Sequence, residues 1–268
     1  FKGVASFPQD QRAEHGFDNR ADHLTLSPLL MESFLKLSQT IVESQDLNAK
    51  ECRSWGWLFA PPGKQADPEA DAGAAEAKAI RSRLRKLLRR AFRRAADPAT
   101  LERFAKFTET QVTGGASFEK AMRTVVGAII GMPDFLYFYE TPGKESPGQE
   151  NKGRQGISDF ELASRLALFF WSSIPDDTLL DLAESGKLSG PKVLSTQIDR
   201  MLNDRRSGRF CDNFPSQWLQ LDRLITSVPD PKKFPYFYLV DGYRTSMHMI
   251  SEPLLLFETV YVLSLIHI

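Results

Sequence analysis

The chain has 268 residues, of which 42% are hydrophobic and 25% are charged, so it is long enough for one large or two medium globular domains. Its 34 basic and 34 acidic residues give a formal net charge of zero, which excludes an overall electrostatic attraction to nucleic acid or to an anionic membrane. No apolar run approaches the length of a membrane span, and neither Cys52 nor Cys211 lies in a CxxC or CxxCH motif. A disulfide between these cysteines stays open, whereas a zinc ribbon or a covalently attached haem within this chain is not expected.

Helical periodicity dominates the N-terminal part of the chain. The first clear helix begins at Ser27-Pro28, where an N-cap residue is followed by proline at the first helical position. Prolines and glycines between residues 52 and 73 predict a long irregular loop. Three aromatic side chains are expected to hold this loop in place: Trp55, Trp57 and Phe59.

Residues 74–94 predict the most one-sided helix of the chain. Its apolar side chains share one face, and nine cations fill the remaining positions from residue 78 onward: Lys78, Arg81, Arg83, Arg85, Lys86, Arg89, Arg90, Arg93 and Arg94. Two interpretations are open, a face that binds a polyanion and a face whose charges are solvated or meet acids of the same chain. The zero net charge favours the second. The acids available to pair are Glu102, Glu109, Asp176, Asp177 and Asp181.

Two further helices and a linker are predicted next. Asp97-Pro98 begins a helix on which Leu101, Phe104 and Phe107 are expected to face inward, and Ser117 caps the following helix. Residues 141–156 are rich in proline, glycine and charge, which predicts a linker with a domain boundary near residues 141–157.

The C-terminal half also reads as a series of helices. A capping box begins one helix at Ser158, Asp176-Asp177 begin a second, and Gly186 ends that helix. Later helices begin at Pro191, include Pro215 as a kink or a start, and bend at Pro253. The predicted fold is all-α, a multi-helix bundle-like array with long irregular loops, at least seven helices and no sheet of more than two short strands.

Residues with chemical potential do not form a catalytic motif. His15 and His23 could share a metal site with nearby aspartates, but we interpret them as polar loop residues, because no two histidines have helical metal-ligand spacing. Met247-His248-Met249 allows a haem-ligand interpretation, although a single histidine in a mixed helix is usually no ligand. GxSxG, HExxH, P-loop and GxGxxG motifs do not occur. We therefore assign no catalytic residue and expect no cofactor or metal site in this chain.

Several motifs after residue 157 resemble one family. They are Phe160–Leu166, Phe170–Ser173, Pro175–Asp177, Arg200–Leu202 and Gln217–Leu219. They resemble large planctomycete-type proteins built from serial domains of unknown function and often joined to cytochrome c-like modules. Signature positions marked by this resemblance, as structural rather than catalytic residues, are Arg165, Trp171, Pro175, Asp176, Gln217 and Trp218. Trp171 and Trp218 are expected to be buried near each other.

The resemblance covers nearly the whole chain. It implies the C-terminal part of a first helical domain at residues 1–50, a second domain with the basic helix at 74–140, and a truncated third domain at 157–268. Residues 263–268 resemble a translated sequencing adapter more than the family, so we expect both ends to be truncated.

Three functional hypotheses follow. The resemblance implies a non-catalytic helical module of an exported bacterial multidomain protein, located in the periplasm or at the cell surface, with haem only on a segment outside this chain. Its expected partners are other domains of the same polypeptide and a redox or cell-surface protein, but not nucleic acid. The second hypothesis is an enzyme whose active site is completed by segments missing from this fragment. The third is polyanion binding through residues 78–94.

Overall fold

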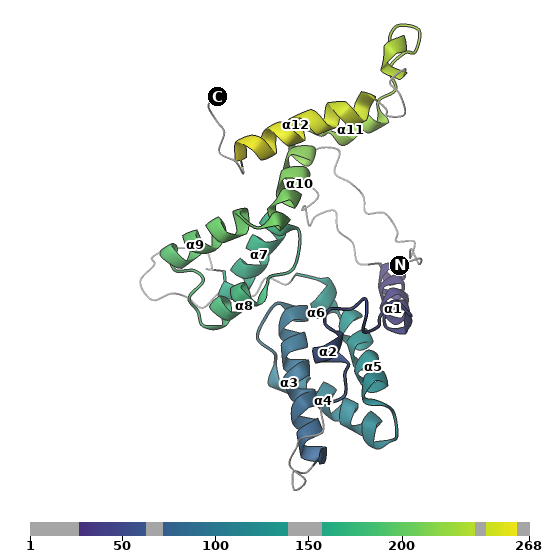
Figure 1. Ribbon diagram of the computed structural model, residues 1–268, viewed down its shortest axis with the longest axis vertical. Helices are drawn as coiled ribbons and strands as arrows, with labels where there is room; N and C mark the ends of the chain where they lie inside the picture. Colours follow the sequence, from purple (N-terminus) through teal and green to yellow (C-terminus); the bar gives the residue numbers. More distant parts are fainter. Residues whose placement is uncertain (1–26, 63–71, 139–156, 239–244, 262–268) are drawn as a thin grey trace. The chain divides into compact units, whose positions relative to one another are not determined.

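All regular secondary structure in the described part of the protein is helical (Figure 1). The computed structural model describes residues 27–62, 72–138, 157–238 and 245–261. These ranges contain twelve α-helices and two short 3₁₀ helices, and no β-strand. The predicted all-α class and the minimum of seven helices are therefore confirmed. The predicted linker at 141–156 lies outside the described residues.

The first compact unit comprises the described residues from 27 to 163 together with Pro175–Leu188. Its frame consists of α1 (Pro28–Glu43), α3 (Ala72–Phe92), α4 (Pro98–Thr113) and α5 (Phe118–Ile130). Helix α3 packs against α4, α4 against α5, and α5 against α1, so the four helices share one core (Figure 1). The largest fully buried side chains of this core are Phe59, Ile80, Leu84, Leu88, Met122 and Ile129.

Side-chain caps explain where three of these helices begin. Ser27, Asp97 and Ser117 have extended backbone, and each side chain accepts a hydrogen bond from the backbone N–H three residues further on. Each cap satisfies one of the N–H groups that the first turn of a helix leaves without a partner. All three starts are those predicted from the sequence.

The segment between α1 and α3 differs from the predicted irregular loop. Its described part contains a short helix, α2 (Trp55–Leu58), followed by the buried side chain of Phe59. Arg123 of α5 donates hydrogen bonds of 2.6 and 2.5 Å to the carbonyl oxygens of Val42 and Leu47. Its guanidinium carbon also lies 5.1 Å from the centre of the Trp55 ring. Arg123 thus binds the end of α1 and two points of the segment after it, Leu47 and Trp55. These contacts explain why the segment has a defined backbone course although its sequence lacks helical periodicity.

The second compact unit comprises Ser164–Ile174 and the described residues from 189 onward. It begins within α7 (Asp159–Trp171) and continues with α9 (Pro191–Leu202), η2 (Arg205–Ser207), α10 (Gly208–Trp218), α11 (Asp222–Thr226), η3 (Pro235–Tyr238) and α12 (Thr245–Tyr261). Both α10 and α11 pack against α12 (Figure 1). None of the described helices is long and apolar enough to cross a membrane.

Aromatic rings make up much of the contact between α7, α10 and α12. Their centroids are 4.7 to 6.0 Å apart, within the range of favourable ring packing. The rings belong to Phe169, Phe170, Phe210, Phe214, Phe257 and Tyr261. Pro215, predicted to mark a kink or a helix start, is a buried interior position of α10, which begins at Gly208.

The signature tryptophans differ from each other in burial. Trp171 is 0% exposed, its Nε1 donates a 3.1 Å hydrogen bond to the Met201 carbonyl oxygen, and the Arg206 guanidinium lies 3.4 Å above its ring. Trp218 is 59% exposed, so the prediction that it is buried is wrong. It is the last residue of α10, and the centre of its ring lies 5.8 Å from that of Phe214.

The other signature residues have mixed surroundings. Arg165 of α7 is exposed, Pro175 is buried, and Gln217 of α10 is half-buried. Asp176 accepts a 3.0 Å hydrogen bond from the Leu179 N–H and thereby caps the next helix. Phe107 of α4 is also exposed, contrary to the prediction that it faces inward.

The two tryptophans form a matched pair for a stability measurement. Trp171→Ala should lower the free energy of unfolding by about 3–5 kcal/mol, because it empties a fully buried site and removes one of the donors to the Met201 carbonyl oxygen. Trp218→Ala should change it by about 1 kcal/mol or less, because most of that ring is already in water. Urea denaturation of both variants checks the difference. Equal losses would contradict the burial described above.

Candidate functional site

Seven cations on α3 and the two that directly follow it, Arg93 and Arg94, make this helix the strongest candidate for a functional surface. Its apolar stripe is buried against the first unit's core, with Ile80, Leu84 and Leu88 at most 1% exposed. The cations therefore border a stripe that other elements already cover. The helix is free to bind a polyanion only if its cations are not already bound by groups of these elements.

Arg81 is bound by two carboxylates of α4. Its Nε lies 2.9 Å from Glu102 Oε1, and its Nη1 forms an ion pair with Glu109. The hydrogen bond from Arg81 lowers the pKa of the Glu102 carboxyl from its ordinary value. Two carboxylates of the neighbouring helix thus bind the Arg81 guanidinium.

Arg89 and Arg90 are bound by the acidic face of α8 (Asp177–Glu184). Arg89 Nη2 lies 2.7 Å from Asp181 Oδ1 and its Nη1 lies 2.6 Å from Glu184 Oε2. Arg90 Nε donates a 2.7 Å hydrogen bond to Asp177 Oδ1, and its Nη2 donates to the other oxygen of the same carboxylate. This two-point contact matches the planar guanidinium fork to the carboxylate, and it lowers the pKa of Asp177.

The remaining contacts of α3 use backbone oxygens and aromatic rings. Arg83 donates to the Ala60 carbonyl oxygen, and its guanidinium carbon lies 4.9 Å from the centre of the Phe118 ring. Lys86 Nζ lies 5.1 Å from the centre of the Trp57 ring. These are cation–π distances. Arg83 and Lys86 thus bind the segment that precedes α3, at Ala60 and Trp57.

Arg93 directly follows Phe92, the last residue of α3, and has an unusual backbone conformation. Its backbone has φ of 55°, a left-handed conformation that a residue with a side chain adopts at some cost in energy. Its buried guanidinium donates hydrogen bonds of 3.0, 3.1 and 2.8 Å to the carbonyl oxygens of Phe135, Asp134 and Tyr137, around α6 (Pro133–Leu136). Burial lowers the pKa of Arg93. Neighbouring Arg94 forms an ion pair with the Asp134 carboxylate.

The predicted internal pairing of the basic helix is confirmed for four acids: Glu102, Glu109, Asp177 and Asp181. Asp176, the fifth, caps α8 instead. Glu184 and Asp134 also pair with these cations, although they were not among the predicted partners. Glu184 shared a detectable signal, because it follows Asp177 and Asp181 on one face at helical spacing. The carbonyl contacts of Arg93 had no such signal.

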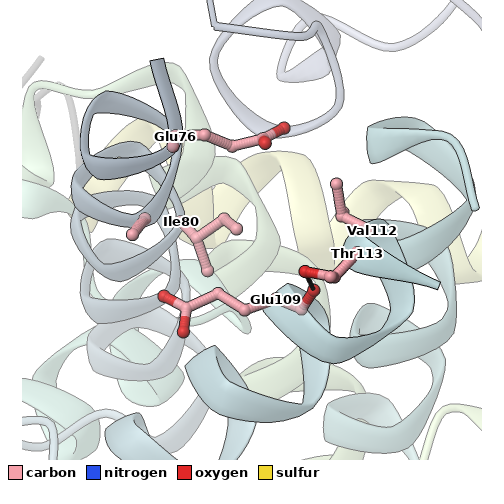
Figure 2. A pocket seen from close by; sticks show the side chains of 7 residues that line it. Glu76, Ile80, Glu109, Val112 and Thr113 are labelled. Atoms are coloured by element: carbon pink, nitrogen blue, oxygen red, sulfur yellow. Dashed lines mark hydrogen bonds between the residues drawn. The ribbon is translucent and has the colours of Figure 1, made fainter. Parts of the chain in front are cut away.

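A small open pocket lies between α3 and α4. It has a volume of about 240 Å³, below the usual range of ligand sites. Figure 2 shows Glu76 and Ile80 from α3 facing it together with Glu109, Val112 and Thr113 from α4. One of its two carboxylates, Glu109, is bound by Arg81. The pocket therefore has one engaged acid and one other, Glu76, rather than a pair set up for acid–base chemistry.

Carboxyl groups with clearly shifted pKa values in the described residues are all shifted downward. The cause is a hydrogen bond from the Thr100 N–H for Asp97, from Arg81 for Glu102, from Arg90 for Asp177 and from Arg206 for Asp204, which lowers the pKa of Asp204 to about 2. A general acid at neutral pH needs the opposite shift. These shifts are therefore those of structural ion pairs and helix caps.

The cysteines and histidines were the other candidates for chemistry. Cys52 and Cys211 are both free thiols. Burial, with contributions from Glu258 and Asp212, raises the pKa of Cys211 to about 11, which disfavours the nucleophilic thiolate. His248 lies on the exposed side of α12, whereas His15 and His23 lie outside the described residues. The described residues contain no group of three or more His, Cys, Asp or Glu side chains that could hold a metal ion.

Three family models match the chain one after another. Residues 1–45 match a Protein of unknown function (DUF1587), residues 79–140 a Protein of unknown function (DUF1595), and residues 157–265 a Protein of unknown function (DUF1592). Searches among curated proteins and among solved structures found no match. Most of α3 thus lies in the second matched region, and α8 lies in the third.

The Arg90–Asp177 pair predicts a specific pH dependence. Because its folded-state pKa is lowered, Asp177 contributes stability above its unfolded-state pKa of about 4, and this contribution is lost as the pH falls through the folded-state value. Asp177→Asn should lower the free energy of unfolding at neutral pH by about 0–1 kcal/mol, since the pair is partly solvated. It should also remove this part of the acid dependence.

A double-mutant cycle isolates the pair. Asp177→Asn combined with Arg90→Ala should be less destabilising than the sum of the single changes, measured by urea denaturation. Arg85→Ala is the matched control, because Arg85 is an exposed arginine of the same helix. Its effect should add to that of Asp177→Asn. Additivity in both cycles would show that the contact contributes nothing.

Proposed function

Because the chain belongs to the planctomycete-type proteins that carry these three domains of unknown function in series, we propose that it is a non-catalytic helical module of an exported multidomain protein linked to c-type cytochrome modules. Its role in this proposal is to hold neighbouring domains of one polypeptide in a fixed arrangement for a redox or cell-surface partner. Haem belongs to a segment outside this chain.

The observation that carries this proposal is that the nine cations at residues 78–94 are mostly bound within the fold. Seven of the nine contact a carboxylate, a carbonyl oxygen or an aromatic ring of the same chain: Arg81, Arg83, Lys86, Arg89, Arg90, Arg93 and Arg94. Two of them join the second matched region to the third through α8. Charges arranged in this way orient segments relative to one another, which is the task of a scaffold.

The export and cytochrome parts of the proposal rest on the family resemblance. The test is to recover the full-length protein from its natural host, determine its mature N-terminus by mass spectrometry, and record a pyridine haemochrome spectrum. We expect an envelope fraction, a processed N-terminus and covalently bound c-type haem. An unprocessed, haem-free protein in the cytoplasmic fraction would refute both parts.

Polyanion binding is the competing function for the same helix, and heparin chromatography separates the two. The chain should elute at modest salt, because most of the α3 cations already have internal partners and few remain to replace counterions. Arg85→Glu with Arg89→Glu should shift elution no more than Lys106→Glu with Lys120→Glu, which changes the net charge equally on α4 and α5. Retention at physiological salt that only the first pair abolishes would favour a polyanion-binding face.

A further inference from the structure

The turn between α11 and α12 exposes an unusual amount of apolar surface. Val228 is 79% exposed and Tyr236 is 82% exposed, and Phe234 lies between them with more than half of its side chain in water. Ile225 of α11 and Met247 of α12, before and after this segment in the sequence, are 48% and 49% exposed. Several large apolar side chains exposed within one short segment are more typical of an interaction site than a single exposed one. We call residues 225–238 the apolar turn.

Hydrogen bonds hold the backbone of the apolar turn in a defined shape. The Asp230 carboxylate accepts a 2.8 Å hydrogen bond from the Lys232 N–H, and the Asp230 carbonyl oxygen accepts from the N–H groups of Lys233 and Phe234 at 3.1 and 2.9 Å. The Thr245 hydroxyl donates a 2.7 Å hydrogen bond to the Phe237 carbonyl oxygen and ties the turn to α12. The exposed side chains are therefore presented by a preorganised backbone, which reduces the entropy lost when they bind.

The charge and the position of the apolar turn indicate the kind of partner that it binds. Lys232 and Lys233 are both exposed and directly precede Phe234, while the one carboxylate between them and Val228 caps the turn. Figure 1 shows the yellow-green segment that carries η3 extending beyond the neighbouring ends of α11 and α12. Aromatic side chains with adjacent lysines are the combination that occupies the interface of a lipid bilayer, where rings enter the headgroup region and ammonium groups meet anionic lipids.

We propose that the apolar turn is a peripheral contact with an anionic lipid surface. Phe234 and Tyr236 enter the headgroup region, and Lys232 and Lys233 bind lipid phosphates. Such a contact needs no membrane-spanning helix and no net positive charge on the whole chain, because the attraction acts over about one Debye length around the turn. A turn this small gives reversible binding rather than permanent anchoring.

Co-sedimentation of the full chain with vesicles tests the proposal. We expect binding to vesicles that contain phosphatidylglycerol and phosphatidylcholine, weaker binding to pure phosphatidylcholine, and release as salt rises. Lys232→Gln with Lys233→Gln should lower the partition coefficient about 25-fold, the fold-change of about 1 kcal/mol for each basic residue at an anionic surface. Phe234→Ser with Tyr236→Ser should lower it on the order of tenfold or more.

Matched changes elsewhere make the outcome decisive. Lys106→Gln with Lys120→Gln removes the same charge from α4 and α5, and Leu29→Ser with Phe107→Ser removes exposed apolar side chains from α1 and α4. Neither pair should reduce binding. Circular dichroism confirms that each variant remains folded. Equal losses in turn and control variants would overturn the proposal. No sedimentation of the parent chain with either vesicle would also overturn it and leave a protein as the occupant of the turn.

Discussion

An arginine guanidinium can bind a carboxylate, a carbonyl oxygen or an aromatic face while its stem covers apolar surface, and the first compact unit depends on this property. On α3 these groups border a buried apolar stripe, and each neighbouring element offers a different acceptor: carboxylates from α4 and α8, carbonyl oxygens around α6, and Trp57 from α2. Each exposed ion pair adds little stability by itself. Together they decide which segments lie against α3.

As a result, the regions that match the family models do not coincide with the compact units of the structure. Helix α8 belongs to the first compact unit, although the segments on both sides of it, 164–174 and the residues from 189 onward, belong to the second. The third family match, 157–265, therefore contributes to both units. The contacts of Arg89 and Arg90 join α3 to this acidic helix, which follows α3 by more than 80 residues. A division of the chain at the limits of the family matches would separate these partners.

Local signals were sufficient to predict much of this fold, whereas contacts made late in a helix were not. Caps such as Ser27 and Ser117 act within four residues, so sequence alone locates them. Four of the acids that pair with the basic helix, Glu102, Glu109, Asp177 and Asp181, were predictable, because a neutral chain contains enough acids to meet its cations. The burial of Trp218 was predicted wrongly because α10 ends at this residue. The periodicity of a sequence does not indicate at which residue a helix ends. Arg93 was missed as a backbone clamp, since carbonyl oxygens occur at every residue and leave no trace in the sequence.

The long separation of the α3–α8 contacts has a consequence for biogenesis. Arg90 and Asp177 are 87 residues apart, so a chain made from its N-terminus completes α3 well before the partner carboxylate exists. At about 5–20 residues per second this interval is roughly 4–17 seconds. During it the arginines that will bind α8 lack their partners on that helix, and the first 94 residues carry 16 basic and 12 acidic side chains, a formal charge of +4. Anionic surfaces and chaperones near the ribosome thus meet the cations of α3 before these are bound by the carboxylates of α8.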